Sequence, residues 1–240
     1  MPLPKINTPT YELELPSTKK KVRYRPFLVK EEKILIMALE TEDMKQISRA
    51  VIDILNACIL SRGVKVKDLS TFDIEYLFLN IRAKSVGEEV EVNVTCPDDG
   101  ETVIQTAILI DDIKVLDNPD HSDVIKLDDN LSVQMIYPSM SQFIENNFEL
   151  NEEKNNVDKS LDIITSCIGQ VFNEDESWSG SDCTKKELKD FVDSMNTKQF
   201  KLVEQFFDTM PKLSHTLKIK NPKTEVESEV VLEGLASFFS

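Results

Sequence analysis

Residues 10–40 read TYELELPSTKKKVRYRPFLVKEEKILIMALE, and they join a patterned hairpin to an apolar helix. Apolar and charged side chains alternate on both sides of a proline-containing turn, which predicts two half-buried antiparallel strands. The charged face is expected to place two glutamates beside two arginines, namely Glu12 and Glu14 beside Arg23 and Arg25. Each opposed cross-strand pair adds about 0.2–1 kcal/mol, so these charges help to fix the register of the hairpin.

The helix that follows contains six consecutive apolar residues, Ile34-Leu35-Ile36-Met37-Ala38-Leu39. A helix that is apolar on every side is normally surrounded by protein, because exposing such a face to water is unfavourable. The sequence therefore predicts that this helix forms a buried spine.

The rest of the chain alternates between the 3.6-residue period of helices and the two-residue period of strands. Helices are predicted over 43–60, from Ser70 onward, after Pro138-Ser139 with Phe143 and Phe148 on it, over 157–172, after Thr184 and after Thr197. Antiparallel strands are predicted for a hairpin over 88–110 with a third strand to Val115, for 124–127 with 131–137, and for 217–220 with 226–232.

This order predicts an α+β fold in which helical clusters carry attached antiparallel β-hairpins. Two similar lobes are expected. The amino-terminal lobe, 1–120, would hold a hairpin, three helices and a second hairpin with a Cys-Pro turn. The carboxyl-terminal lobe, 121–240, would hold a strand pair, helices and the terminal hairpin.

Three segments resemble one known family. They are LPSTKKKVRYRPFLVKEEKILIMALE at 15–40, FDIEYLFLNIRAKSVGEEVEVNVTCPDDGE at 72–101 and VVLEGLASFF at 230–239. The chain is similar to the baseplate hub proteins of T4-type contractile-tailed bacteriophages, the family called T4 bacteriophage baseplate protein. The resemblance implies a part in forming the central hub of the tail baseplate.

Within that family the chain is expected to be either an assembly factor or chaperone for the hub, or a resident structural subunit of the virion. The resemblance implies other baseplate hub proteins as partners, and self-association is left open. It also implies a location in the host cytoplasm during assembly and, for a resident subunit, in the virion tail baseplate.

Composition excludes several other classes of protein. The formal net charge of −15, from 43 acidic and 28 basic residues, argues against nucleic acid as a partner because phosphate binding requires a basic surface. The longest apolar run is far shorter than the roughly 18 residues of a membrane span, and no signal pattern is recognised at the start. A hydrophobic content of 40% suffices for a core.

The turn Cys96-Pro97-Asp98-Asp99-Gly100 resembles the turn on which a zinc ribbon presents a cysteine pair. A structural zinc site needs four ligands, but Asp99 stands where the second cysteine would be, so we expect no metal and no other cofactor. The terminal hairpin has a similar turn at Asn221-Pro222-Lys223-Thr224. We hypothesise that the two hairpins are related knuckles in which turn residues replace the metal.

Two features are candidates for binding a partner protein. One is the basic hairpin, with Lys19, Lys20, Lys21, Arg23 and Arg25, which is either a solvated turn or a surface that docks on an acidic neighbour. The other is Trp178, the only tryptophan, in the acidic loop EDESWSGSDC. Its side chain either folds back onto the domain or anchors a partner.

The sequence shows no recognisable catalytic motif, and the protein is expected not to be an enzyme. Its two histidines, His121 and His215, have no nucleophile motif nearby. The acidic pairs Asp111-Asp112 and Asp128-Asp129 lack the pattern of a calcium loop. A hydrolase with a dispersed active site remains a remote alternative.

Overall fold

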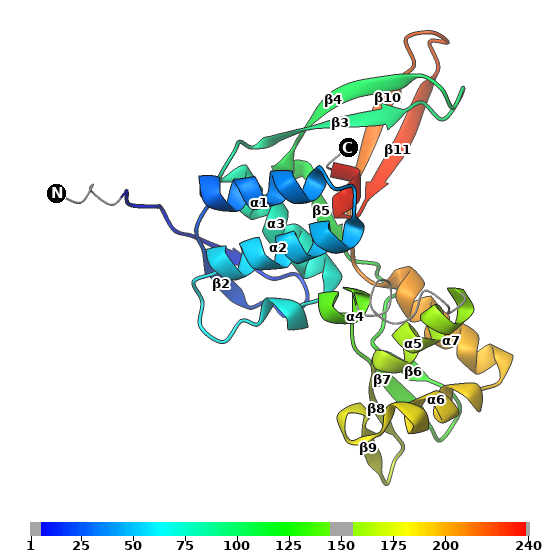
Figure 1. Ribbon diagram of the computed structural model, residues 1–240. Coiled ribbons are helices and arrows are strands. Elements are labelled where there is room, and N and C mark those ends of the chain that lie inside the picture. Colours follow the sequence, from blue (N-terminus) through cyan, green and yellow to red (C-terminus); the bar gives the residue numbers. More distant parts are fainter. Residues whose placement is uncertain (1–5, 145–155, 239–240) are drawn as a thin grey trace. The chain divides into compact units, whose positions relative to one another are not determined.

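The computed structural model describes residues 6–144 and 156–238, and Figure 1 colours the chain from blue at the amino terminus to red at the carboxyl terminus. Helices and small antiparallel sheets both form, which confirms the predicted α+β class. The chain divides into two compact units. The first unit contains residues 1–66, 72–116 and 212–240, and the second contains 67–71 and 117–211.

This division differs from the predicted boundary at residue 120, because the last hairpin returns to the first unit. Strand β10 (Lys212–Lys220) pairs on one side with β11 (Glu227–Glu233) and on the other with β5 (Lys114–Leu116). Leu213 and Phe238 are fully buried in the core of the first unit. The second unit is therefore an insertion between β5 and β10, and the two units are not two similar halves of the sequence.

The first unit also contains β1 (Tyr11–Glu14), β2 (Lys21–Tyr24), α1 (Val29–Leu39), α2 (Met44–Cys58), β3 (Glu89–Thr95), β4 (Val103–Leu109) and nearly all of α3 (Thr71–Ala83). In the β1–β2 hairpin Glu12 lies opposite Arg23, as predicted, but Glu14 lies opposite Lys21 and not near Arg25. The Nζ atom of Lys21 also lies 3.4 Å from Glu12. Arg25 lies beyond the end of β2 and has no partner across the hairpin register.

The turn of this hairpin is attached to α3. The carboxylate of Asp73, in the first turn of α3, accepts hydrogen bonds from the backbone N–H of Ser17, at 3.0 Å, and from the Ser17 hydroxyl. Asp73 is fully buried. These bonds hold the lysine-bearing turn in one place against the body of the unit.

Helix α1 is not enclosed on every side, so the prediction of a buried spine is wrong for the single chain. It packs on α2, beside which Figure 1 shows it, and buries Glu31, Leu35 and Ala38 on that side. Ile36 and Met37 are 49% and 67% exposed. The apolar run extends around the helix, but neighbouring elements of the unit cover only one face of it.

The buried spine of the first unit is α3. Leu77, Phe78 and Leu79 are consecutive, point in different directions around the helix, and are each no more than 1% exposed. The helix predicted from Ser70 onward is therefore buried on more than one side. The β3–β4 hairpin and the β10–β11 hairpin pack against it through one shared apolar cluster.

The turns of these two hairpins bind each other. The side-chain amide of Asn221 donates to both carboxylate oxygens of Asp98 and to Oδ2 of Asp99, each at 3.0 Å. The Thr224 hydroxyl also donates to Asp98, and Asn221 is only 1% exposed. The arrangement fits the hypothesis that side chains hold the two turns where a zinc ribbon would use a metal.

The third strand predicted near Val115 forms, but its partner is not β4. Val115 lies in β5, opposite Leu213 of β10. Sequence periodicity identifies a strand and leaves its partner open, and here the partner is nearly one hundred residues away.

The second unit contains β6 (Val124–Lys126), β7 (Ser132–Met135), α4 (Met140–Ile144), α5 (Asn156–Ser166), β8 (Ile168–Phe172), β9 (Ser177–Ser179), α6 (Lys185–Asp193) and α7 (Thr197–Thr209). The four strands form one antiparallel sheet in the order β6-β7-β8-β9. The apolar cluster of this unit joins the sheet to α5, α6 and α7. Most of the predicted helix after Ser139, including Phe148, lies outside the described residues.

The predicted helix over 157–172 is wrong in its last third, because α5 ends at Ser166 and residues 168–172 form β8. Ile168 and Val171 fit a helical period, which explains the error. Gly169 favours the strand, since a Cβ at that position would lie 2.8 Å from the Ile136 side chain and 3.2 Å from the Gln134 carbonyl oxygen. The glycine therefore permits a close approach of β8 to the segment that carries β7.

We predict that replacing Asn221 destabilises the first unit. Asn221→Ala leaves the Asp98 and Asp99 carboxylates without their shared donor, and we expect a loss of about 1–3 kcal/mol in the free energy of unfolding. Asn221→Asp should cost more, because it adds a third carboxylate at the same point. Denaturant unfolding measures both effects, with the exposed Asn93→Asp as control. Equal stability of the two Asp variants would contradict the proposed role of Asn221.

We also predict a pH dependence that arises from Glu75 on α3. Burial raises the pKa of Glu75 to about 7, from a usual value of 4.5, although its carboxylate accepts a 3.0 Å hydrogen bond from the Leu235 N–H. The folded state holds this proton more tightly than the unfolded state. The stability that Glu75 contributes is thus fully present below pH 4.5 and is lost as the pH rises to about 7.

Glu75→Gln should remove this loss, because the neutral amide mimics the protonated acid. We expect a gain on the order of 1–3 kcal/mol at pH 8 and little change at pH 4.5. The free energy of unfolding at the two pH values tests this, with the exposed Glu89→Gln as control. A gain of the same size at both values would show that titration of Glu75 is not the cause.

Candidate protein-contact surfaces

The basic turn, defined here as Lys19, Lys20, Lys21 and the neighbouring Arg23, lies on the surface of the first unit. All four side chains are exposed. Lys19 adopts a left-handed backbone conformation, with φ of 57°, and its N–H donates to the Leu15 carbonyl. The backbone therefore holds three consecutive lysines at the tip of a fixed hairpin.

Arg25, the fifth basic residue of the sequence prediction, has a structural role. Its guanidinium donates to Oε1 of Glu31 at 2.9 Å and to the Pro26 carbonyl at 2.8 Å. Glu31 is itself buried, and its second carboxylate oxygen accepts from the Leu28 N–H at the start of α1. Arg25 therefore does not belong with the exposed residues of the basic turn.

The ion pair also explains why the Glu31 carboxyl group stays ionised. Burial raises the pKa of Glu31, but the hydrogen bonds from Arg25 and from the Leu28 N–H outweigh this effect and leave the pKa below its usual value. The carboxylate stays charged, and Arg25 is its main counter-ion.

The second surface is the outer face of α1, defined as Val29, Ile34, Ile36 and Met37. These side chains are between 45% and 67% exposed, and the exposed Lys30 and Lys33 lie among them. Contiguous apolar side chains bordered by charge mark interaction sites on soluble proteins. The sequence shows the apolar run, but the two lysines just before it are the signal that one side of the helix faces outward.

The third surface is a pocket around Trp178 in the second unit. Trp178 on β9 lies opposite Val171 on β8, and Leu188 and Phe191 of α6 line the other side. The cavity measures about 310 Å³. Trp178 is 42% exposed, so its ring forms one wall of the pocket and is neither fully folded into the core nor free in solution.

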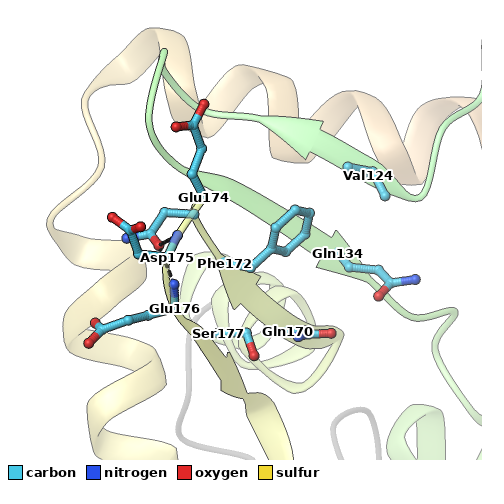
Figure 2. Close-up of a pocket in the computed structure, with 9 residues that line it drawn as sticks. Val124, Gln134, Gln170, Phe172, Glu174, Asp175, Glu176 and Ser177 are labelled. Atoms are coloured by element: carbon cyan, nitrogen blue, oxygen red, sulfur yellow. Dashed lines mark hydrogen bonds between the residues drawn. The ribbon is translucent and has the colours of Figure 1, made fainter.

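An acidic turn, Asn173–Glu176, joins β8 to β9 and leads directly to Trp178. The Asn173 side chain accepts hydrogen bonds from the backbone N–H groups of Asp175 and Glu176, at 2.9 and 2.6 Å. Figure 2 shows Glu174, Asp175 and Glu176 projecting from this turn at the end of an open hollow. The turn thus presents three exposed carboxylates on a fixed backbone.

The hollow in Figure 2 lies on the polar face of the sheet and measures about 460 Å³. Gln134, Gln170 and Phe172 line it, from β7 and β8. Trp178 and Val171 occupy the opposite strand face, because side chains alternate along a strand. The acidic turn lines the hollow, and along the chain it ends at Glu176, two residues before Trp178.

The histidines occupy structural positions. The ring nitrogens of His121 lie 3.0 Å from the hydroxyl oxygens of Thr209 and Tyr137, and the ring packs against Phe206. His215 lies 3.2 Å from the Asp112 carbonyl oxygen. Over residues 6–144 and 156–238, no three His, Cys, Asp or Glu side chains gather as a metal site. None of the helices in these ranges has the length and apolar content of a membrane span.

We predict that Arg25 and the basic turn respond differently to mutation. Arg25→Ala leaves the buried Glu31 carboxylate without its main counter-ion and should cost about 3 kcal/mol in the free energy of unfolding. Adding Glu31→Gln should recover part of that loss. The triple change Lys19→Glu, Lys20→Glu and Lys21→Glu should cost less than about 1.5 kcal/mol, because these side chains are exposed. Chemical denaturation compares the three proteins, and equal losses for Arg25 and for the lysines would refute the distinction.

The chain matches the family model described as T4 bacteriophage base plate protein over residues 8–240, which is nearly its whole length. Neither the curated proteins nor the solved structures contain a match. The family match confirms the resemblance seen in the amino-terminal hairpin, the segment 72–101 and the carboxyl end. The chain belongs to the T4 bacteriophage base plate protein family.

Proposed function

We propose that this base plate protein acts without catalysis, as an assembly factor for the central hub, through reversible contacts with other hub proteins. The outer face of α1 is the observation that carries the proposal. Its four exposed apolar side chains lie on a short helix that is anchored by its opposite face. Burying such a side chain contributes up to about 1.5–3 kcal/mol, so a complex in which a partner covers this face is stabilised.

The chemistry of the face favours a reversible contact over a permanent one. Permanent interfaces are large and mainly apolar, whereas α1 spans 11 residues and carries two exposed lysines within its apolar surface. The basic turn is a second exposed, charged surface of the same unit. Together they fit a partner whose contact surface combines apolar and acidic groups, met in the host cytoplasm during assembly.

The alternative is a resident subunit of the virion baseplate, which would use the same surfaces. Quantitative mass spectrometry of purified virions separates the two roles. An assembly factor should be absent from virions or far below the copy number of the other baseplate proteins. Recovery at a stoichiometric level would overturn the assembly-factor role and establish the resident one.

We predict that Ile36→Glu with Met37→Glu abolishes partner binding and preserves the fold. The new carboxylates would have to be buried against the partner, so we expect at least a tenfold loss of hub-protein capture in co-expression pull-downs. Unfolding should change by less than about 1 kcal/mol, since both side chains face solvent in the free chain.

The control is Val231→Glu, which places one carboxylate at an exposed apolar position on β11 and is compared with Ile36→Glu and Met37→Glu singly as well as together. It should leave capture unchanged. Undiminished capture by the α1 variant would remove the outer face of α1 from the proposal, whereas equal loss in both variants would point to a general effect of added charge.

A further inference from the structure

The Trp178 pocket differs from the α1 face in shape, because the pocket is concave and the helix face is convex. Val171 and Trp178 supply one wall from adjacent strands, and Leu188 and Phe191 supply another from α6. Leu131, before β7, and Cys183, before α6, complete the apolar lining. Elements from three parts of the second unit therefore converge on one cavity.

The lining favours an apolar protein side chain over a small molecule. Small-molecule sites also begin at about 300 Å³, but they contain a few placed polar groups that orient the ligand. The charged group of this lining, the Glu187 carboxylate, already accepts hydrogen bonds from the N–H and hydroxyl of Thr184, both at 2.7 Å. It serves as the capping box of α6. The pocket offers area for hydrophobic contact, and its polar group is engaged elsewhere.

The chain around the pocket is acidic on balance. Between residues 173 and 184 the chain carries four carboxylates and no Lys, Arg or His. Three of them project from the acidic turn, which ends two residues before Trp178. Lys185, the first basic residue after this stretch, lies 3.7 Å from Asp162 of α5. Lys186 and Lys189 of α6 are also exposed, but over residues 173–191 six carboxylates outnumber three lysines, so a segment seated in the pocket meets net negative charge.

We propose that the Trp178 pocket binds one large apolar side chain of a partner protein, on a segment in which lysine or arginine flanks that side chain. The apolar group fills the cavity and the flanking cations reach Glu174, Asp175 and Glu176. A second copy of this chain is a poor occupant, because two molecules of net charge −15 repel each other. The inference rests on the proposed function in taking the partner from among the baseplate proteins.

The inference gives the protein two contact surfaces of opposite charge. The basic turn and the lysines of α1 suit an acidic surface, whereas the Trp178 pocket suits a basic segment. The two surfaces belong to different units of the chain. One molecule can therefore bring two different hub proteins together.

Trp178 provides the measurement, because it is the only tryptophan in the chain. The probes are overlapping 15-residue peptides that cover the other baseplate proteins of the same phage, with phenylalanine in place of tryptophan. The full-length protein is titrated with each peptide, and the shift of tryptophan emission is recorded. We expect the active peptides to contain a large apolar residue flanked by Lys or Arg.

In an active peptide, changing the apolar residue to Ser or the flanking cations to Glu should weaken binding at least tenfold. The protein variant with Glu174→Gln, Asp175→Asn and Glu176→Gln should bind more weakly and show a smaller dependence on salt. Absence of any active peptide, or active peptides without flanking cations, would overturn the proposal. An emission shift that depends on protein concentration without peptide would indicate a second copy and would also overturn it.

Cys183 allows the pocket to be blocked without mutation. It is half-buried, whereas Cys58, Cys96 and Cys167 are buried, so N-ethylmaleimide should modify Cys183 in the folded protein. The thiolate sulfur adds to one carbon of the maleimide double bond, and water supplies a proton to the other. Modified protein should lose the peptide response at least tenfold, and a full response after complete modification would show that the peptides bind elsewhere.

The α1 variant Ile36→Glu, Met37→Glu separates this inference from the proposed function. It should lose hub-protein capture and keep the peptide response at Trp178. Normal capture by the unmodified protein together with no active peptide would refute the pocket and leave the proposed function intact. Active peptides together with undiminished capture by the α1 variant would refute the role of α1 and leave the pocket intact.

Discussion

The pairing of β5 with β10 is the constraint on which the architecture depends. It places Leu116 opposite Lys212, so the chain leaves the first unit and returns to it at neighbouring points of one sheet. The 95 residues between them belong to the second unit, which has its own apolar cluster. Closing so long a loop costs conformational entropy, and the shared cluster of β3, β4, β10 and α3 offsets that cost.

The contact between the two hairpin turns completes the same construction. Asn221 is buried and binds two aspartates from a turn more than 120 residues earlier in the chain. Buried polar groups are costly when unpaired, and here each partner satisfies the others. The hydrogen bonds define which turn meets which, whereas the apolar cluster below them would tolerate several arrangements. Specificity and stability thus come from different residues of the same pair of hairpins.

Local features of the fold could be predicted from the sequence because they depend on neighbouring residues. The pairing of Glu12 with Arg23 follows from alternation around one turn, and the cap of α6 follows from Thr184. The cap of α7 is Asn196, one residue before the predicted Thr197. The strand at 168–172 could not be predicted, since Ile168 and Val171 also fit a helix. What distinguishes the strand is the space at Gly169, which is a property of the packed sheet.

The candidate surfaces show the same limit. Exposure of Ile36 and Met37 depends on how many elements pack around α1, and an apolar run does not contain that information. Likewise, five basic residues in one short stretch look equivalent in the sequence. Only the packed structure separates Arg25, which neutralises the buried Glu31, from the four exposed residues of the basic turn.

Distribution of charge then decides which surfaces remain available for recognition. A buried ion pair such as Arg25 with Glu31 satisfies its own charges and leaves nothing for a partner. The lysines of the basic turn and the carboxylates of the acidic turn keep their charges exposed, on backbones that hydrogen bonds fix in place. Three consecutive exposed lysines on one unit and three consecutive exposed carboxylates on the other give two surfaces of opposite charge, and this difference is what would tell two partners apart in the proposed contacts.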